Sequence, residues 1–271
     1  MKGGKAKTSS ARAVAASETS AMAASAKLEA DALSGPFTLA IDIGGTRVKG
    51  AVVSANGVLA ADPKHLATPV PATPDQVIKV IVSIASSMPS FARISAGFPG
   101  VVKRGHVLTA PNLGTASWEG VDLASQLSRK FDVPARVLND AAVQGLGVVE
   151  GPGLECVLTL GTGVGCAVYR ARRLVLPLEF GQHRRRGKKN YDAYLGNAAL
   201  HAKGVDRWNK RLAKTIDEVV SLMNCDVLYL GGGNARKIAL QLPANVKVVS
   251  NLAGITGGLR LWDPDMEEHF S

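Results

Sequence analysis

The chain has 271 residues, which is enough for one large domain or two small ones around a substantial core. Hydrophobic residues make up 46% and charged residues 20%, as in a soluble globular protein, and no apolar run approaches the roughly 20 residues of a membrane helix. We therefore expect no membrane as partner. The net charge of +10 favours a polyanionic partner or substrate, although a basic solubilising surface would give the same figure.

Residues 1–36 are mostly Ala, Ser, Gly and Lys, with almost no large apolar side chains. Such a segment cannot offset the entropy lost on ordering, so we predict a disordered Ala/Ser-rich extension. Its basic, Ser-rich beginning leaves a transit peptide as an alternative, against which Glu18, Glu29 and Asp31 count. The ordered protein is predicted to start at Phe37.

The first predicted strands form a hairpin. An apolar run at 39–43 enters the turn Gly44-Gly45-Thr46, and a second run leaves it at 48–53. A further turn predicts a strand at 58–61, and the apolar spacing at 77–84 predicts a helix with Asp75 as its N-cap. The next predicted elements are a strand at 94–98, a helix at 123–131, a strand at 135–138 and a helix at 141–149.

The same pattern then repeats. A second apolar hairpin turns at Gly161-Thr162-Gly163, an amphipathic helix covers 205–224, and a strand at 227–230 leads into Gly231-Gly232-Gly233. This repeat predicts an α/β duplication with a cleft between two halves. We place a small N-terminal α/β domain at 37–139, with a C-terminal helix as a candidate addition to it, and a large C-terminal α/β domain at 140–271.

The two glycine turns suggest two facing halves that share one phosphate group. Glycine lets backbone N–H groups approach an anion, and Thr adds a hydroxyl donor. Asp42 directly precedes the first turn. A carboxylate beside a phosphate site is favourable only with a cation between them, so we assign Asp42 to Mg²⁺, held through water. The alternative is a turn aspartate that bonds its own backbone.

Asn139 and Asp140 end a predicted strand and open a helix, where an aspartate can be merely an N-cap. Phosphoryl transfer to an alcohol, however, needs a carboxylate that accepts the hydroxyl proton, and Asp140 lies between the two phosphate turns. Other polar residues that suit a polyol follow strand or turn signals: Asn112, Trp118, Glu179 and His183. Trp118 can pack against a sugar face, but a core position is the more common fate of a tryptophan, and a structural or solvated position is the alternative for His183.

A basic tract follows the second hairpin. Its members are Arg184, Arg185, Arg186, Lys188, Lys189, Lys203, Arg207, Lys210, Arg211 and Lys214. A nucleotide needs few cations, whereas a long polyanion is favoured by a cationic track because each neutralised phosphate releases counterions. The tract therefore favours inorganic polyphosphate as a phosphate donor. A solvated basic helix face is the alternative, and we expect no nucleic acid as partner.

Four motifs together resemble those of the ROK sugar kinases, members of the actin/hexokinase/Hsp70 superfamily. They are Asp42-Ile43-Gly44-Gly45-Thr46, Gly97-Phe98-Pro99-Gly100, Asn139-Asp140 and Leu160-Gly161-Thr162-Gly163-Val164-Gly165. Residues 178–183, the basic tract and residues 191–196 are similar to the polyphosphate glucokinase and glucomannokinase branch. The resemblance covers nearly all of 37–262. It implies a two-domain actin/hexokinase-like α/β fold, a ribonuclease H-like duplication with an interdomain cleft, and a homodimer.

The resemblance also implies an activity, the transfer of the terminal phosphoryl group of polyphosphate to the 6-hydroxyl of glucose. ATP stays open as a second or alternative donor, and mannose as an alternative sugar. Asp140 would be the general base. The implied sugar-binding residues are Gly97, Pro99, Gly100, Asn112, Asn139, Asp140, Glu179 and His183. The implied donor-binding residues are Asp42, Gly44, Gly45, Thr46, Lys49, Thr159, Gly161, Thr162, Gly163, Gly231, Gly232 and Gly233.

The chain departs from the family pattern in two respects. Many ROK members carry a Cys-rich zinc loop after a Glu-x-Gly-His motif, but the cysteines here (156, 166 and 225) are scattered, so we predict no structural zinc and a reducing, cytoplasmic setting. Gln182 stands where the motif's His would fall, and His183 comes one residue later. ROK-type regulators add a helix-turn-helix ahead of this fold, and residues 1–36 show no apolar periodicity for one.

Overall fold

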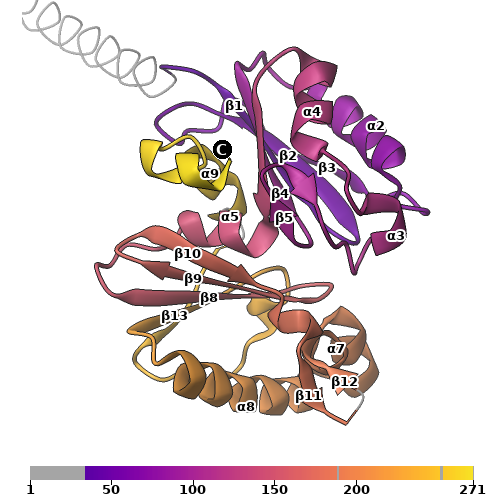
Figure 1. Cartoon of the computed structure of the whole chain (residues 1–271). Coiled ribbons are helices and arrows are strands. Elements are labelled where there is room, and N and C mark those ends of the chain that lie inside the picture. The colour runs from indigo at the N-terminus through magenta and orange to yellow at the C-terminus, as the bar shows by residue number, and fades with distance from the viewer. Residues whose placement is uncertain (1–33, 188, 251–252, 271) are drawn as a thin grey trace, which may run out of the picture.

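The computed structural model describes residues 34–187, 189–250 and 253–270. The predicted extension at 1–36 falls mostly on residues outside this description, as does Lys188 of the predicted basic track. The described chain forms two halves, each built on a five-stranded sheet (Figure 1). Helices α5 (Asp140–Leu146) and α9 (Ala253–Arg260) contact each other and lie between the two sheets.

The first sheet has the strand order β3-β2-β1-β4-β7. Strand β2 runs antiparallel to both of its neighbours, β1 and β3, whereas β4 and β7 run parallel to β1. The bounds of these strands are β1 Thr38–Ile43, β2 Arg47–Val53, β3 Lys64–Ala67, β4 Arg93–Phe98 and β7 Ala135–Asn139. The two short strands β5 Val102–Lys103 and β6 His106–Val107 form a separate hairpin.

The second sheet repeats this topology with the order β10-β9-β8-β13-β14. Its first three strands are again antiparallel, and β13 and β14 run parallel to β8. The bounds are β8 Leu154–Leu160, β9 Val164–Arg170, β10 Arg173–Leu178, β13 Val227–Gly231 and β14 Val246–Val248. The two glycine turns therefore occupy equivalent places, one after β1 and the other after β8.

The helices cover the outer faces of the sheets, α2 and α4 on the first half and α8 on the second (Figure 1). Their bounds, with those of the smaller helices, are α2 Pro74–Ala85, α3 Thr115–Trp118, α4 Leu123–Phe131, α6 Tyr191–Leu195, α7 Asn197–Lys203 and α8 Val205–Met223. The remaining elements are the short strands β11 Arg184–Arg186 and β12 Lys189–Asn190 and the 3-10 turns η1 Phe180–Gln182, η2 Ala235–Lys237 and η3 Pro264–His269.

Each half has its own apolar core, and a tryptophan lies at the centre of each. Trp118 has no exposed surface, packs on Phe98 at 4.7 Å between ring centroids, and donates from Nε1 to the carbonyl of Ala72. Trp208 on α8 is equally buried and donates to the carbonyl of Leu195. Trp118 is thus a core residue, the more common of the two fates considered for it, and is not accessible to a sugar.

Two predicted details of the first half are wrong. Residues 58–61 form only an isolated bridge, Val53 to Leu59, and the third strand is Lys64–Ala67. All four residues of that strand are exposed, so no apolar alternation marks it. The N-cap of α2 is Thr73 rather than Asp75, because Pro74 already occupies the first turn. Among the described residues, no helix is long and apolar enough to cross a membrane.

Candidate functional site

A cavity of about 540 Å³, which we call the cleft, opens between the two halves. Part of its lining comes directly after the parallel strands β1, β4 and β7 of the first sheet and β8 and β13 of the second, and the rest comes from β2, the helices α5, α6, α7 and α9 and the connecting loops. The carboxyl ends of parallel strands are the usual ligand sites of open α/β sheets. The predicted donor and sugar residues that line it are Asp42, Gly44, Gly45, Thr46, Lys49, Pro99, Gly100, Asn112, Asn139, Asp140, Thr159, Gly161, Thr162, Gly163, Glu179, Gly232 and Gly233.

The two glycine turns meet across the cleft. Thr46 and Thr162 lie 3.2 Å apart between their Oγ1 atoms, although 116 positions separate them in sequence. Gly45 fits tightly at this contact, since a Cβ there would lie 3.1 Å from Cγ2 of Thr162 and 3.2 Å from Cβ of Asn112. Backbone and hydroxyl donors of both halves therefore converge on one region of the cleft, as a phosphate site requires.

Asp140 lies where α5 begins, directly after β7, the edge strand of the first sheet. Burial raises the pKa of its carboxyl to about 7, and the negative charges of Asp42 and Glu179 add to this effect. The N–H of Ala141, which donates to Oδ1 at 2.8 Å, acts in the opposite direction. A carboxyl with a pKa near neutrality has the basicity that a general base needs.

Asn139 holds this region in place. Its Oδ1 accepts the N–H of Ala142 at 3.1 Å, which caps α5, and its Nδ2 donates to the carbonyl of Gly100 at 3.1 Å. Only 5% of the residue is exposed. Gly97 lies behind the same corner, where a Cβ would be 3.3 Å from Cα of Asp140. The side chain of Asn139 thus ties Asp140 to the loop at 99–100.

Asp42 is paired with a cation of the protein itself. The Nζ of Lys49 lies 2.7 Å from Oδ2 of Asp42, and both side chains are partly exposed to the cleft. No group of three His, Cys, Asp or Glu among the residues described here could hold a metal ion. Magnesium commonly takes only one or two carboxylates and completes its shell with water and substrate phosphates, so Asp42 fits such an ion.

The segment after β10 brings further polar groups to the cleft. Asp192 accepts the N–H of Val164 at 2.7 Å and Nε2 of Gln182 at 2.6 Å, and so links this segment to the second glycine turn. Glu179 lines the cleft, and burial raises its pKa, with a smaller contribution from the charge of Asp192. His183 is exposed and outside the described cleft wall, where Gln182 lies instead.

Gly231 is also outside the described cleft wall; a Cβ there would lie 2.9 Å from Oε1 of Gln144. Gly231 packs against the side-chain amide of Gln144, which itself lines the cleft, whereas Gly232 and Gly233 are in the cleft wall. The sequence motif therefore marks a turn whose second and third residues, rather than its first, are accessible to a ligand.

The predicted basic track lies on α7, α8 and the β11–β12 hairpin, beside the cleft rather than in its described wall. Its exposed members are Arg184, Lys189, Lys203, Arg207, Lys210 and Lys214. Arg185 is engaged elsewhere, since it pairs with Glu218 and lies 4.5 Å from the ring centre of Tyr194. Arg211 contacts the same ring at 4.7 Å and donates to the carbonyl of Tyr194.

Several cleft residues escaped the sequence reasoning. Arg47 follows the first glycine turn, Arg236 follows the third, and His201 lies on α7. Asn234 also lines the cleft and donates to the carbonyl of Gly161 at 3.1 Å. Arg47 and Arg236 could have been found from the sequence, because each follows a phosphate-type glycine turn within a few positions. Nothing local in the sequence distinguishes His201.

Comparisons with known proteins agree with this geometry. A polyphosphate glucokinase of Mycobacterium leprae (strain TN) is 32% identical over 235 residues, which are 80% of this chain and 72% of that protein. A polyphosphate glucokinase of Mycobacterium tuberculosis (strain CDC 1551 / Oshkosh) is 30% identical over 234 residues, 80% of this chain and 88% of its own.

Solved structures show the same fold. An inorganic polyphosphate/ATP-glucomannokinase from Arthrobacter sp. strain KM matches with a TM-score of 0.76 at 26% identity, covering 83% of this chain and 98% of that one. A ROK family glucokinase from Streptomyces griseus, in complex with glucose and AMPPNP, matches with a TM-score of 0.68 at 19% identity, covering 83% and 98%. The predicted actin/hexokinase-like α/β fold is confirmed. The ROK family model matches residues 38–176, and the chain belongs to the ROK family.

Proposed function

We propose that this protein is a polyphosphate glucokinase, which transfers the terminal phosphoryl group of inorganic polyphosphate to the 6-hydroxyl of glucose. The observation that carries the proposal is the carboxyl of Asp140, with a pKa of about 7, in a cleft that both glycine turns line. The two mycobacterial relatives named polyphosphate glucokinase, and the Arthrobacter structure, support the same reaction and donor.

In the proposed reaction Asp140 accepts the proton of the sugar 6-hydroxyl while the hydroxyl oxygen attacks the terminal phosphorus of the donor in line. A bond forms between that oxygen and phosphorus, and the bond to the bridging oxygen breaks. The products are glucose 6-phosphate and a polyphosphate shorter by one unit. The pKa of about 7 keeps a large fraction of Asp140 ionised near neutral pH and leaves it basic enough to take the proton.

The sugar would be held beside Asp140 by groups that accept and donate to hydroxyls. Glu179 and Asn112 line the cleft, and the loop at 99–100 is fixed through Asn139. We add Gln182 to this set and give His183 no sugar contact, because Gln182 lines the cleft and His183 is exposed outside it. Glucose and mannose differ at C2, so these contacts leave both sugars as acceptors.

The donor phosphates would be bound by the two glycine turns together with Arg47, Lys49 and Arg236. Asp42 would hold Mg²⁺ through water, and the ion supplies neutralisation of the phosphate charge when it is bound. Lys49 already compensates one oxygen of Asp42, so this carboxylate can lie next to an anionic donor at low electrostatic cost.

Polyphosphate as donor is supported by the exposed basic residues on α7, α8 and the β11–β12 hairpin, since α7 also carries the cleft residue His201. ATP is the second candidate donor. The observation that favours it is the accessible turn at Gly232 and Gly233 with Asn234 and Arg236 behind it. An ATP-dependent ROK kinase without preference for polyphosphate is the runner-up function.

An initial-rate panel tests the proposal. Glucose, mannose, fructose and N-acetylglucosamine are each paired with polyphosphate and with ATP, with and without Mg²⁺. We expect the highest kcat/KM for glucose with polyphosphate and loss of turnover without Mg²⁺. Activity with ATP alone would select the runner-up function, and no transfer to any of these sugars would contradict a sugar kinase.

The homodimer and the cytoplasmic setting are also part of the proposal. The family resemblance supports the first, and the scattered, buried thiols at 156, 166 and 225 support a reducing compartment for the second. Light scattering on the purified protein measures the dimer directly. A monomer at micromolar concentration would contradict that part and leave the chemistry of the cleft untouched.

A further inference from the structure

Gln144 of α5 lines the cleft, and only 8% of the residue is exposed. Within residues 34–187, 189–250 and 253–270, its side-chain amide has no hydrogen-bond partner. In this part of the chain the Nε of Arg185 is the only fully buried side-chain nitrogen or oxygen without a partner, so the amide of Gln144 keeps contact with the cleft. Buried polar groups are nearly always paired, because an unpaired one costs free energy. The amide therefore marks a place where a ligand can supply the missing partner.

Two glycines of the second half fix the place of this amide. A Cβ at Gly231 would lie 2.9–3.0 Å from Oε1, Cδ and Nε2 of Gln144. A Cβ at Gly165 would lie 2.8 Å from Cβ of Ala141. The lack of a side chain at both positions lets α5 lie directly on the second sheet. The amide of Gln144 consequently lies against the backbone at the end of β13.

The end of β13 belongs to the phosphate side of the cleft. The turn at 231–233 is bonded to the second glycine turn through the next residue, Asn234. Its N–H donates to the carbonyl of Leu160 at 2.8 Å, and its Nδ2 donates to the carbonyl of Gly161 at 3.1 Å. The groups assigned to the sugar come instead from the β4–β7 connection and from the segment after β10.

Gln144 also follows the proposed base by one helical turn. Asp140 and Gln144 are four positions apart on α5, so they lie on the same side of the helix, about 6 Å apart along its axis. The side of α5 that faces the cleft thus carries the base first and then an amide beside the turn at 231–233. A donor whose terminal phosphoryl group lies at Asp140 would place its next phosphate unit near this amide.

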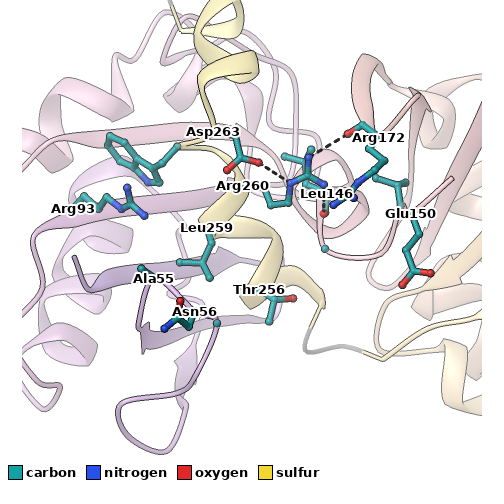
Figure 2. Close-up of a pocket in the computed structure, with 14 residues that line it drawn as sticks. Ala55, Asn56, Arg93, Leu146, Glu150, Arg172, Thr256, Leu259, Arg260 and Asp263 are labelled. Atoms are coloured by element: carbon teal, nitrogen blue, oxygen red, sulfur yellow. Dashed lines mark hydrogen bonds and ion pairs between the residues drawn. The ribbon is translucent and has the colours of Figure 1, made fainter. Parts of the chain in front are cut away.

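The polar groups at the far end of α5 are arranged differently. That end lines a second cavity of about 460 Å³, in which the carbonyl of Leu146 accepts from Nη1 of Arg260 at 3.4 Å (Figure 2). Nε of Arg260 in turn donates to Asp263 at 2.8 Å. These groups satisfy one another without a ligand. The unpartnered amide of α5 is on the side of the cleft.

We propose that Gln144 binds the phosphate donor, with its Nε2 donating to a non-bridging oxygen of the phosphate unit next to the one transferred. Ionised phosphate oxygens only accept hydrogen bonds, and the amide nitrogen of Gln144 offers two donors. When the bridging bond breaks, negative charge stays on this unit, so the hydrogen bond is stronger in the transition state than in the ground state. The inference rests on the proposed kinase function and holds for polyphosphate and for ATP alike.

Two substitutions of similar size test the proposal in the full-length protein. Gln144→Met removes both N–H groups and should lower kcat/KM about tenfold with either donor, the effect of losing one hydrogen bond to a charged group. Gln144→Glu should lower it further, because a carboxylate repels the phosphate, and it also carries the test if Gln144→Met does not fold. The Kd for glucose should change less than about twofold in both. Gln126→Met on α4, outside the cleft wall, is the matched control and should change nothing.

Stability separates this role from a structural one. The amide has no partner within the described residues, so Gln144→Met should unfold at the same or a higher urea concentration than wild type. A structural role would instead lower stability and glucose affinity together. Values of kcat/KM within twofold of wild type for Gln144→Met with both donors, or near-normal activity of Gln144→Glu, would overturn the proposal.

Calorimetry with inorganic tripolyphosphate and Mg²⁺, without glucose, measures donor binding apart from turnover. We expect a Kd raised several-fold to about tenfold in Gln144→Met. A wild type that binds tripolyphosphate but transfers nothing to any sugar would contradict the proposed function, while the two Kd values would still decide the role of Gln144. Equal Kd values, or no binding to wild type, would overturn the inference.

Discussion

The two halves share one sheet topology and differ in what they attach to it. Strands β1, β2, β3, β4 and β7 of the first half match β8, β9, β10, β13 and β14 of the second in order and direction. The first half connects β3 to β4 through α2 alone, whereas the second connects β10 to β13 through residues 179–226, which contain η1, β11, β12, α6, α7 and α8. The shared parts supply the glycine turns, and the added segment supplies Glu179, Gln182, Asp192 and the exposed basic residues.

This difference separates two kinds of residue. The glycine turns that would bind the donor, and the base Asp140, lie at the ends of strands that both halves share. We therefore expect substitutions at these positions to be poorly tolerated. The exposed basic residues that would select the donor and the sugar contacts Glu179 and Gln182 lie in this added segment, whereas Asn112 and the loop at 99–100 come from the β4–β7 connection of the first half. The predictions below alter first the shared strand ends and then the added segment.

The largest effect is expected for the base. Asp140→Asn should lower kcat by a factor of about 10²–10⁴, the usual contribution of a general base, with the glucose Kd changed less than about threefold. The change is nearly isosteric, so it preserves the contacts of α5 while removing the basic oxygen. A coupled assay and calorimetry measure the two quantities. A variant with near-normal kcat would remove Asp140 from the chemistry.

Glycines of the second turn should differ sharply from one another. A Cβ at Gly163 would lie 2.7–2.9 Å from the carboxylate of Asp192, so Gly163→Ala must displace the bonds to Val164 and Gln182. We expect about a tenfold loss of kcat/KM, typical of a shift of a few tenths of an ångström in a positioned site. Gly161→Ala is the comparison, because nothing in the protein lies within 4 Å of a Cβ there and any loss it causes comes from crowding of the bound donor. A loss in Gly163→Ala no larger than that in Gly161→Ala would contradict the positioning role of Asp192.

Loss of basic residues from the segment between β10 and β13 should raise the KM for polyphosphate more than the KM for ATP. The triple change Arg184→Gln, Lys189→Gln and Lys203→Gln removes exposed cations and leaves Arg185 with Glu218. The KM for long polyphosphate should rise several-fold to about tenfold, with a shallower salt dependence, and the KM for ATP should change less than about twofold. Lys64→Gln with Lys79→Gln on the first half is the control. An equal rise for both donors would disprove a polyphosphate track.

The smallest expected effect is on stability. The pKa of Asp140 is about 7 in the fold, against about 3.9 in an unfolded chain, so the wild type loses stability as pH rises from about 4 through about 7. Asparagine does not ionise in this pH range, so the variant avoids this loss. The free energy of unfolding of Asp140→Asn should therefore be about 1–3 kcal/mol higher than that of the wild type at pH 8, with a smaller difference at pH 5. Urea denaturation at both pH values checks this; no pH dependence of the difference would argue against the raised pKa.

The sequence predicts the long, apolar elements of the two halves better than the short or exposed elements between them. The helix at 123–131 matches α4 residue for residue, and the strand at 227–230 falls inside β13, because apolar periodicity and clear turn residues bound both. The strand Lys64–Ala67 is fully exposed and lacks such periodicity. The short helices α6 and α7 end at glycines within a few residues, so their periodic pattern is too brief to recognise.

The roles of individual residues are also predictable only in part. Asp42, Asp140 and the glycine turns follow strand ends, and strand ends are predictable. The partners of Arg185 and the role of Asp192 depend on contacts across 28 to 33 positions, which no local pattern records. Lys49 pairs with Asp42 because the two residues face each other in the β1–β2 register, a relation that follows from the hairpin but not from composition.

The pH dependence of kcat/KM for glucose tests the central claim most directly. With saturating polyphosphate, the account predicts a rise with unit slope through a pKa of about 7, which is the ionisation of Asp140 before glucose binds. Asp42→Asn should move this midpoint to lower pH, because the charge of Asp42 contributes to the raised pKa. A rate that is flat between pH 5.5 and pH 8.5 would contradict the assignment of Asp140 as the base.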